Sequence, residues 1–165
     1  MSIPRSVEKS AEMLELQKAD PEGYVHMSRI YPGLPHWMNR KDAEALPWMA
    51  TFTRKPWPKK VVWYQDDITH QRFYWLQLPD GVAAKEQKII AEIIGQKINL
   101  TGDIPEGIQL LLSDELLDLD KTIEISVNGQ KPSKIKAVRS LKTIRDALSK
   151  QLDPAITPTA VAPCP

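Results

Sequence analysis

The chain has 165 residues, 42% of them hydrophobic, and its mean hydropathy of −0.36 is typical of a soluble globular protein. The 22 Lys and Arg residues nearly balance the 21 Asp and Glu residues, which excludes the strongly basic surface of a nucleic-acid-binding or membrane-binding protein. A single cysteine, Cys164, excludes an intrachain disulfide and a cysteine-based zinc cluster.

The first predicted element is an amphipathic helix over residues 6–18. Val7, Ala11 and Leu14 recur there at helical spacing and give the helix one apolar face. The same stretch lacks the basic start and apolar centre of a signal peptide, so a cytoplasmic location is the default expectation. Further along the chain, no apolar run approaches the length of a membrane span.

A predicted strand begins at Tyr24 and ends at Tyr31, and a rigid turn follows it. This turn, residues 32–38, contains two prolines and one glycine, which restrict the path of the backbone. Asn39 is expected to cap the next helix because its side chain can accept a hydrogen bond from a free N–H group. Pro47 should divide that helix into two short pieces.

A proline-stiffened linker, residues 55–60, marks the predicted domain boundary. We expect one segment over residues 1–57 and one domain over residues 58–165. Alternating apolar and polar residues in the second domain predict strands over residues 61–64, 70–78, 88–94, 96–100, 108–112 and 122–127. An Asn-Gly pair at 128–129 then predicts a hairpin, with a return strand near residues 134–138.

The last predicted helix covers residues 139–152, where Leu141, Ile144 and Leu148 share one face. An edge strand is expected over residues 156–161, and the proline-rich tail after it is expected to be disordered. Together these elements predict an α+β fold. In this fold an N-terminal helix–strand–helix segment packs on a β-sandwich-like domain that carries one amphipathic helix.

A family resemblance rests on five segments, which are Gly23–His26, Arg29–Ala43, Ala45–Ala50, Lys60–Trp63 and Thr69–Leu76. They resemble the C-terminal part of bacterial α/β-hydrolases of the dienelactone-hydrolase and prolyl-peptidase-like type, together with the β-rich extension of such enzymes. The resemblance covers most of the chain. It implies that the first segment corresponds to the end of a hydrolase domain. In that fold the histidine of the catalytic triad follows the last strand of the sheet, and His36 stands at the matching place.

The resemblance implies that His36 is a triad-type general base, but the family's nucleophile and acid lie upstream of the matched region. An α/β-hydrolase places its serine in Gly-x-Ser-x-Gly at a strained elbow, and no serine of this chain lies in such a motif. We therefore expect a hydrolase-derived module that is inactive alone and needs an upstream hydrolase polypeptide for catalysis. The alternative is a non-catalytic β-sandwich module for binding or assembly.

Other chemical sites find little support in the sequence. The plausible metal ligands are His26, His36 and His70 with Asp66 and Asp67, and their spacing matches no metal motif, so we expect no metal. No glycine-rich loop joins a strand to a helix, so we expect no phosphate site, no dinucleotide site and no cofactor.

Aromatic residues cluster on the first two strands predicted after the linker. Because neighbouring residues of a strand point to opposite faces, Trp63 and Trp75 are predicted to be core residues. Tyr64, Tyr74 and Trp57 are then expected on the other face, against the N-terminal segment.

The predicted strand from Tyr24 to Tyr31 would have a parallel neighbour in a hydrolase, and this chain supplies none. An unpaired strand offers its backbone groups to another chain. Val25, Met27 and Ile30 would be exposed with it. Two copies that pair antiparallel about a twofold axis would satisfy the backbone and cover these side chains, so we expect a homodimer through this strand.

Overall fold

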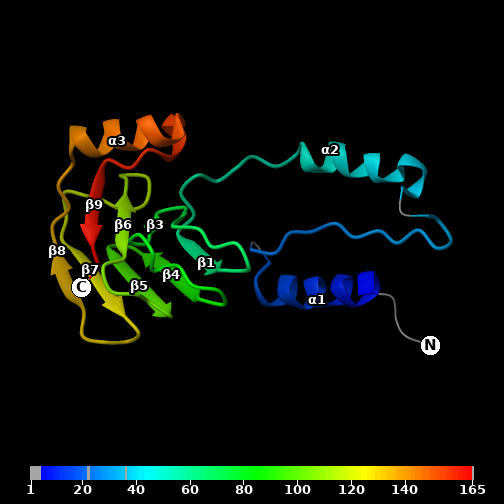
Figure 1. Cartoon of the computed structure of the whole chain (residues 1–165), viewed down its shortest axis with the longest axis horizontal. Coiled ribbons are helices and arrows are strands. Elements are labelled where there is room, and N and C mark those ends of the chain that lie inside the picture. The colour runs from blue at the N-terminus through cyan, green and yellow to red at the C-terminus, as the bar shows by residue number, and fades with distance from the viewer. Residues whose placement is uncertain (1–4, 22, 36, 165) are drawn as a thin grey trace. The chain divides into compact units, whose positions relative to one another are not determined.

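The computed structural model of the chain describes residues 5–21, 23–35 and 37–164 (Figure 1). Three α-helices and nine strands in these residues make an α+β fold that is rich in sheet, as predicted. The chain divides into two compact units, Met1–Arg54 and Lys55–Pro165. Among the described residues, no helix combines the length and the apolar character needed to cross a membrane.

The first unit contains α1 (Arg5–Ala19), the 3-10 helix η1 (Met38–Glu44) and α2 (Ala45–Met49). The helix predicted over the start of the chain is confirmed by α1. Asn39 is not a helix cap: it lies inside η1 with φ 49°, and Arg40 follows with φ 65°. Asparagine tolerates this left-handed conformation because its short side chain bonds locally.

Two short helical pieces are found around Pro47, as expected, but the junction lies between Glu44 and Ala45. Pro47 is therefore the third residue of α2 rather than a break within a helix. The first turn of a helix leaves its N–H groups without intrahelical partners, so the missing N–H of proline costs nothing there.

Residues 24–31 do not form the predicted strand. A strand needs a neighbour, and no backbone N–H between Val25 and Ile30 donates a backbone hydrogen bond within the described chain. The segment instead lies beside α1, and the hydroxyl groups of Ser10 on α1 and Ser28 on the segment contact each other. The apolar positions that suggested a strand are half exposed, with Val25 at 48% and Ile30 at 47% of full exposure.

The second unit is built from two sheets. A five-stranded sheet has the order β1-β4-β5-β7-β8, with β1 (Lys60–Tyr64), β4 (Lys88–Ile94), β5 (Lys97–Gly102), β7 (Ile123–Val127) and β8 (Ser133–Ile135). A four-stranded sheet has the order β2-β3-β6-β9, with β2 (Arg72–Phe73), β3 (Leu76–Gln77), β6 (Gln109–Leu112) and β9 (Ala160–Pro163). All described strand pairs are antiparallel except β5 with β7.

The hairpin of β4 and β5 shows how local sequence sets the register. Gly95 and Gln96 connect the strands, and Gly95 has φ 59°, a conformation that suits glycine in a two-residue hairpin turn. Ile94 therefore pairs with Lys97, and the strand alternation sends Ile89 and its equivalents inward. Both strands were predicted, together with the turn at Gly95.

The single strand predicted over residues 70–78 is wrong, because the chain reverses in its middle. Tyr74 has φ 50°, and Phe73 on β2 pairs with Leu76 on β3 across the turn. The reversal places Trp75 in the core at 0% exposure, with its indole Nε1 donating to the carbonyl of Pro58 at 2.7 Å. Burial of a large aromatic side chain with a satisfied N–H compensates for the strained tyrosine.

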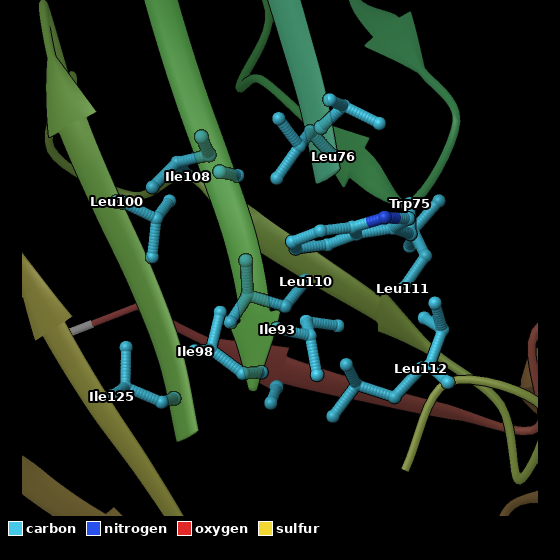
Figure 2. Close-up of a cluster of buried hydrophobic side chains, with 14 of the residues drawn as sticks. Trp75, Leu76, Ile93, Ile98, Leu100, Ile108, Leu110, Leu111, Leu112 and Ile125 are labelled. Atoms are coloured by element: carbon cyan, nitrogen blue, oxygen red, sulfur yellow. The ribbon is translucent and has the colours of Figure 1, made fainter. Parts of the chain in front are cut away.

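One hydrophobic core joins the two sheets. Figure 2 shows Trp75, Leu110 and Leu112 from the four-stranded sheet and its turn beside Ile93 and Ile98 of the five-stranded sheet. Trp63 is buried with them, so the core assignment of both predicted tryptophans is confirmed.

The other three aromatic residues do not share one surface. Tyr64 and Tyr74 are exposed, whereas Trp57 packs against the core of the second unit. The expected grouping of Trp57 with the two tyrosines is therefore wrong. Strand alternation does not apply to Trp57 because it precedes β1.

The C-terminal region contains α3 (Leu141–Gln151), η2 (Pro154–Ile156) and β9. Ser140 caps α3 by accepting a hydrogen bond from Thr143 N–H. In Figure 1, α3 is drawn in orange beside the red strand β9, which it contacts. The predicted apolar face of α3 is only partly covered, since Leu141 remains 85% exposed.

The disordered tail predicted after residue 161 is wrong. Ala160 and Ala162 on β9 pair with β6 and are fully buried, so these small residues complete the core. Cys164 N–H then donates to the carbonyl of Ile108. Pro163 lies on this edge strand opposite Gln109, a position where proline is tolerated.

Candidate functional site

A groove of about 190 Å³ lies between α3 and the outer face of the four-stranded sheet. All its residues belong to the second unit. We call it the α3 groove, and it is lined by Arg72, Gln77, Gln109, Leu111, Lys142, Thr143, Asp146, Ala147, Lys150, Pro158 and Val161.

Strand register builds the floor of the α3 groove. Arg72 on β2 pairs with Gln77 on β3, and Gln77 pairs with Gln109 on β6. Paired residues of neighbouring strands lie on the same face of a sheet. Arg72, Gln77 and Gln109 therefore form a continuous polar row across three strands.

An apolar strip lies beside the polar row. Leu111 pairs with Val161 in the register of β6 with β9, and both line the groove. Leu110 and Leu112 point into the core, so Leu111 must point outward. It is nevertheless only 4% exposed, which shows how closely this part of the sheet is covered.

The helix supplies the other wall. Lys142, Asp146 and Lys150 recur every four residues and so lie on one face of α3. Lys142 Nζ lies 2.6 Å from Asp146 Oδ2, and this hydrogen bond is the main cause that lowers the pKa of Asp146. The negative charge of Asp146 is therefore already paired with Lys142 of the same helix.

Arg72 is the most unusual charge of the α3 groove. Its Nε donates to the carbonyl of Tyr74 at 3.3 Å, and its Nη2 donates to the carbonyl of Ile156 at 3.2 Å. Burial lowers its pKa, and no carboxylate contributes to the shift. The guanidinium thus meets only neutral acceptors among the described residues, and the groove carries three basic side chains against one acidic one.

Two larger hollows are less suited to a charged ligand. One of about 550 Å³ lies at the end of the five-stranded sheet. There Lys97 and Lys134 both approach the carboxylate of Glu124, at 3.6 and 3.5 Å, so each lysine already has an acidic partner. The other, of about 400 Å³, lies in the first unit beside Ser10 and His26.

The histidines singled out by the sequence do not assemble into a site in the described chain. His36, the predicted triad base, lies outside the described residues. His26 is in the first unit, where its Nδ1 lies 3.2 Å from the carbonyl of Tyr24. The backbone of His70, in the second unit, bonds the side-chain amide of Gln65. Within the residues that the structure describes, no group of three metal-ligating side chains is found.

We compared the chain with models of protein families, with curated proteins and with solved structures. None of the three comparisons found a match. The family resemblance of the sequence therefore stays a prediction.

The α3 groove has only a weak signature in the sequence, which is the presence of polar Arg72, Gln77 and Gln109 in otherwise apolar strands. The three residues come together only through the turn at Tyr74 and the pairing of β3 with β6. Neither feature has a sequence motif.

Proposed function

We propose that this chain is a non-catalytic binding module in which the β-sandwich presents the α3 groove to a small ligand or to a single side chain of a partner. The observation that carries the proposal is the continuous polar row of Arg72, Gln77 and Gln109 beneath α3. A polar row of this kind beside an apolar strip offers both orientation and contact area to a ligand.

The rigidity of the scaffold supports the same function. Leu110 and Ile98, from the two sheets, are fully buried, so the core is closed behind the groove. Residues on regular strands hold their positions more accurately than residues on loops. Most of the floor of the α3 groove lies on such strands, with Gln77, Gln109 and Val161 on β3, β6 and β9.

An NMR screen of the full chain with mixtures of small neutral fragments tests the proposal. We expect chemical-shift changes to concentrate at Gln77, Gln109 and Val161. Ala147→Trp fills the groove and should abolish these changes. Ser149→Trp, on an exposed part of the same helix, is the matched control and should leave them unchanged. The α3 groove is excluded as a binding site if neither these fragments nor small anions shift a groove resonance of the folded protein.

The hydrolase-derived module is the second candidate, and one observation favours it. Tyr31, Pro32, Gly33 and Leu34 form a turn in which Leu34 N–H faces the carbonyl of Tyr31 at 3.4 Å. Proline and a glycine with φ 74° occupy the central positions that a type II turn requires. In this second proposal, the turn leads to His36, which acts as general base for a nucleophile and an acid from an upstream hydrolase polypeptide.

A fluorophosphonate probe separates the two candidates. The isolated chain should show no stoichiometric serine labelling, because it lacks the nucleophile elbow. Labelling of an upstream hydrolase polypeptide that requires this chain, and that is lost with His36→Ala, would establish the hydrolase-derived function. Unchanged labelling with His36→Ala would remove it.

A further inference from the structure

We propose that the α3 groove binds an oxyanion, a carboxylate or a phosphate group, with Arg72 as its main ligand and Gln77 and Gln109 as further donors. This inference rests on the proposed binding function and specifies the chemistry of the ligand. It follows from the hydrogen-bond partners of these three side chains in the free protein, from the charges around them and from the size of the groove.

Arg72 carries a charge that the protein itself does not neutralise. A guanidinium has five N–H donors, and the two bonds to the carbonyls of Tyr74 and Ile156 occupy two of them. A partly buried charge is costly unless it is paired, and no carboxylate of the described chain pairs with Arg72. An oxyanion in the groove would supply the missing partner, and a guanidinium binds such groups through two parallel bonds.

The side-chain amides of Gln77 and Gln109 are also available to donate hydrogen bonds to a ligand. Gln65, Gln87 and Gln96 each donate a side-chain N–H to a backbone carbonyl, so the amides of these three glutamines are held by hydrogen bonds within the domain. The structure gives the amides of Gln77 and Gln109 no such bond to another described residue. Their N–H groups can therefore turn toward a ligand held by Arg72.

The surrounding charges attract an anion. Lys142 and Lys150 line the helical wall, and the single acidic residue of the groove, Asp146, is bonded to Lys142. Lys150 forms no ion pair with any residue that the structure describes. The field in the groove is therefore positive, and an open positive groove raises the local concentration of anions.

The size of the groove limits the ligand. Drug-sized ligands occupy sites of about 300 Å³ or more, and the α3 groove has about 190 Å³. Leu111 and Val161 form its apolar strip. The groove therefore suits one carboxylate or phosphate group with a short apolar attachment, such as an acidic side chain, rather than a whole nucleotide.

Titration of the full chain with sodium phosphate and with sodium acetate, at constant ionic strength set with chloride, tests the inference by NMR. We expect saturable shifts of the Arg72 Nε–H and of the two glutamine amides with one or both anions, and none with chloride. The two titrations distinguish a phosphate site from a carboxylate site. Arg72→Gln should weaken binding about tenfold or more, because a charged bidentate partner is lost.

Lys131→Gln is the matched control, because Lys131 is an exposed basic residue between β7 and β8 that does not line the groove. It should leave the affinity unchanged. Gln109→Glu provides a second variant in case Arg72→Gln unfolds: Gln109 is exposed, and a carboxylate there should abolish anion binding with little change in thermal stability.

The inference would be overturned by equal shifts with chloride, by equal affinity in wild type and in a folded Arg72→Gln variant, or by anion binding that survives Gln109→Glu. Neutral fragments that bind when neither anion does would also overturn it, while leaving the proposed binding function in place. If neither fragments nor anions bind, both proposals fail.

Discussion

Gly102, the last residue of β5, occupies a position that only glycine fits. Its φ is 103°, and a Cβ there would meet the carbonyl oxygen of Lys88 at 2.2 Å. The side-chain amide of Asn128 bonds both backbone groups of Gly102, so the backbone cannot easily move away.

We therefore predict that Gly102→Ala lowers the free energy of unfolding by about 3 kcal/mol, the sum of a left-handed backbone penalty and overpacking. Gly95→Ala is the control, because Gly95 also has a positive φ but faces open space. It should cost only about 1 kcal/mol. Urea unfolding measures both values, and equal costs would show that contact with Lys88 is unimportant.

Cys164 is expected to react slowly in the folded protein. Burial raises the pKa of its thiol from 9.0 to about 11. Only about one thiol in 1,000 is then ionised at pH 8, and the thiolate is the reactive form. Iodoacetamide should alkylate the native chain far more slowly than the chain in urea, and a native rate equal to the unfolded rate would contradict this.

The same shift has a consequence for stability. The folded state favours the neutral thiol. The contribution of Cys164 to the free energy of unfolding is therefore complete below pH 9.0 and is lost as the pH rises through about 11. The stability difference between wild type and Cys164→Ala should therefore fall over that window.

At the scale of elements, one side chain ties the loop between β6 and β7 to the start of α3. Arg139 binds Asp114 through Nε and Nη2, at 3.0 and 2.6 Å, and binds Asp120 through Nη1 at 2.6 Å. The hydrogen bond from Arg139 is the main cause that lowers the pKa of Asp114. A carboxylate with a lowered pKa stabilises the fold above its unfolded pKa, and this contribution disappears as the pH falls through the folded pKa.

Arg139→Gln should therefore lower the thermal midpoint at pH 7 by a small amount, as expected for exposed ion pairs. The difference from wild type should shrink as the pH drops below 3.8, the ordinary pKa of an aspartate. Hydrogen exchange should also become faster in residues 113–122. Arg145→Gln, the control, should leave exchange in this loop unchanged, and a midpoint difference that persists at pH 2 would contradict the role of the carboxylates.

Elements with strong local signals were predicted well. The alternation in β4 and β5 and the turn at Gly95 are local properties of the chain, and the structure confirms them. The reversal at Tyr74 was missed because a non-glycine residue with a positive φ has no sequence signature. The edge strand expected over residues 156–161 was placed too early: β9 is Ala160–Pro163, and alternating alanines mark its bounds only weakly.

The candidate site was harder to predict than the strands that build it. Arg72, Gln77 and Gln109 are separated in sequence, and their alignment depends on register across three strands. Register is decided by the packed core and by turn geometry rather than by the residues of the row. The family resemblance therefore pointed to His36, and no local pattern pointed to a groove that depends on tertiary pairing.

For the whole molecule, we predict that residues 55–165 fold without the first unit. The hydrophobic core and the residues packed on it extend from Trp57 to Cys164 and draw on no described residue before them. The backbone of Pro58 also belongs to this unit, since its carbonyl accepts the hydrogen bond from Trp75. A fragment of residues 55–165 should show a cooperative thermal transition by calorimetry.

A fragment of residues 58–158 is the informative comparison, because it ends before β9. It should lack that transition, since it exposes β6 and loses Ala160 and Ala162 from the core. A cooperative transition in this shorter fragment would show that β9 is dispensable.

The homodimer expected from the sequence remains a prediction, but it can no longer rest on a preformed strand. Residues 24–31 are not a preformed strand, but no backbone N–H from Val25 to Ile30 donates a backbone hydrogen bond in the described chain, and Val25 and Ile30 are about half exposed. Each large apolar side chain covered on association contributes about 1.5–3 kcal/mol at most. Light scattering at micromolar concentration should give the mass of two chains, and Val25→Asp should give one. A monomeric wild type would refute the dimer.

The position of β9 has a consequence for the synthesis of the protein. This strand is made last in its unit, yet it pairs with β6 and delivers Ala160 and Ala162 to the core. While the ribosome holds these residues, the edge of β6 stays open, and an open edge can pair with other nascent chains. The sandwich can close only after translation has passed Pro163. A nonsense codon shortly before β9 would therefore release an aggregation-prone chain rather than a slightly shorter domain.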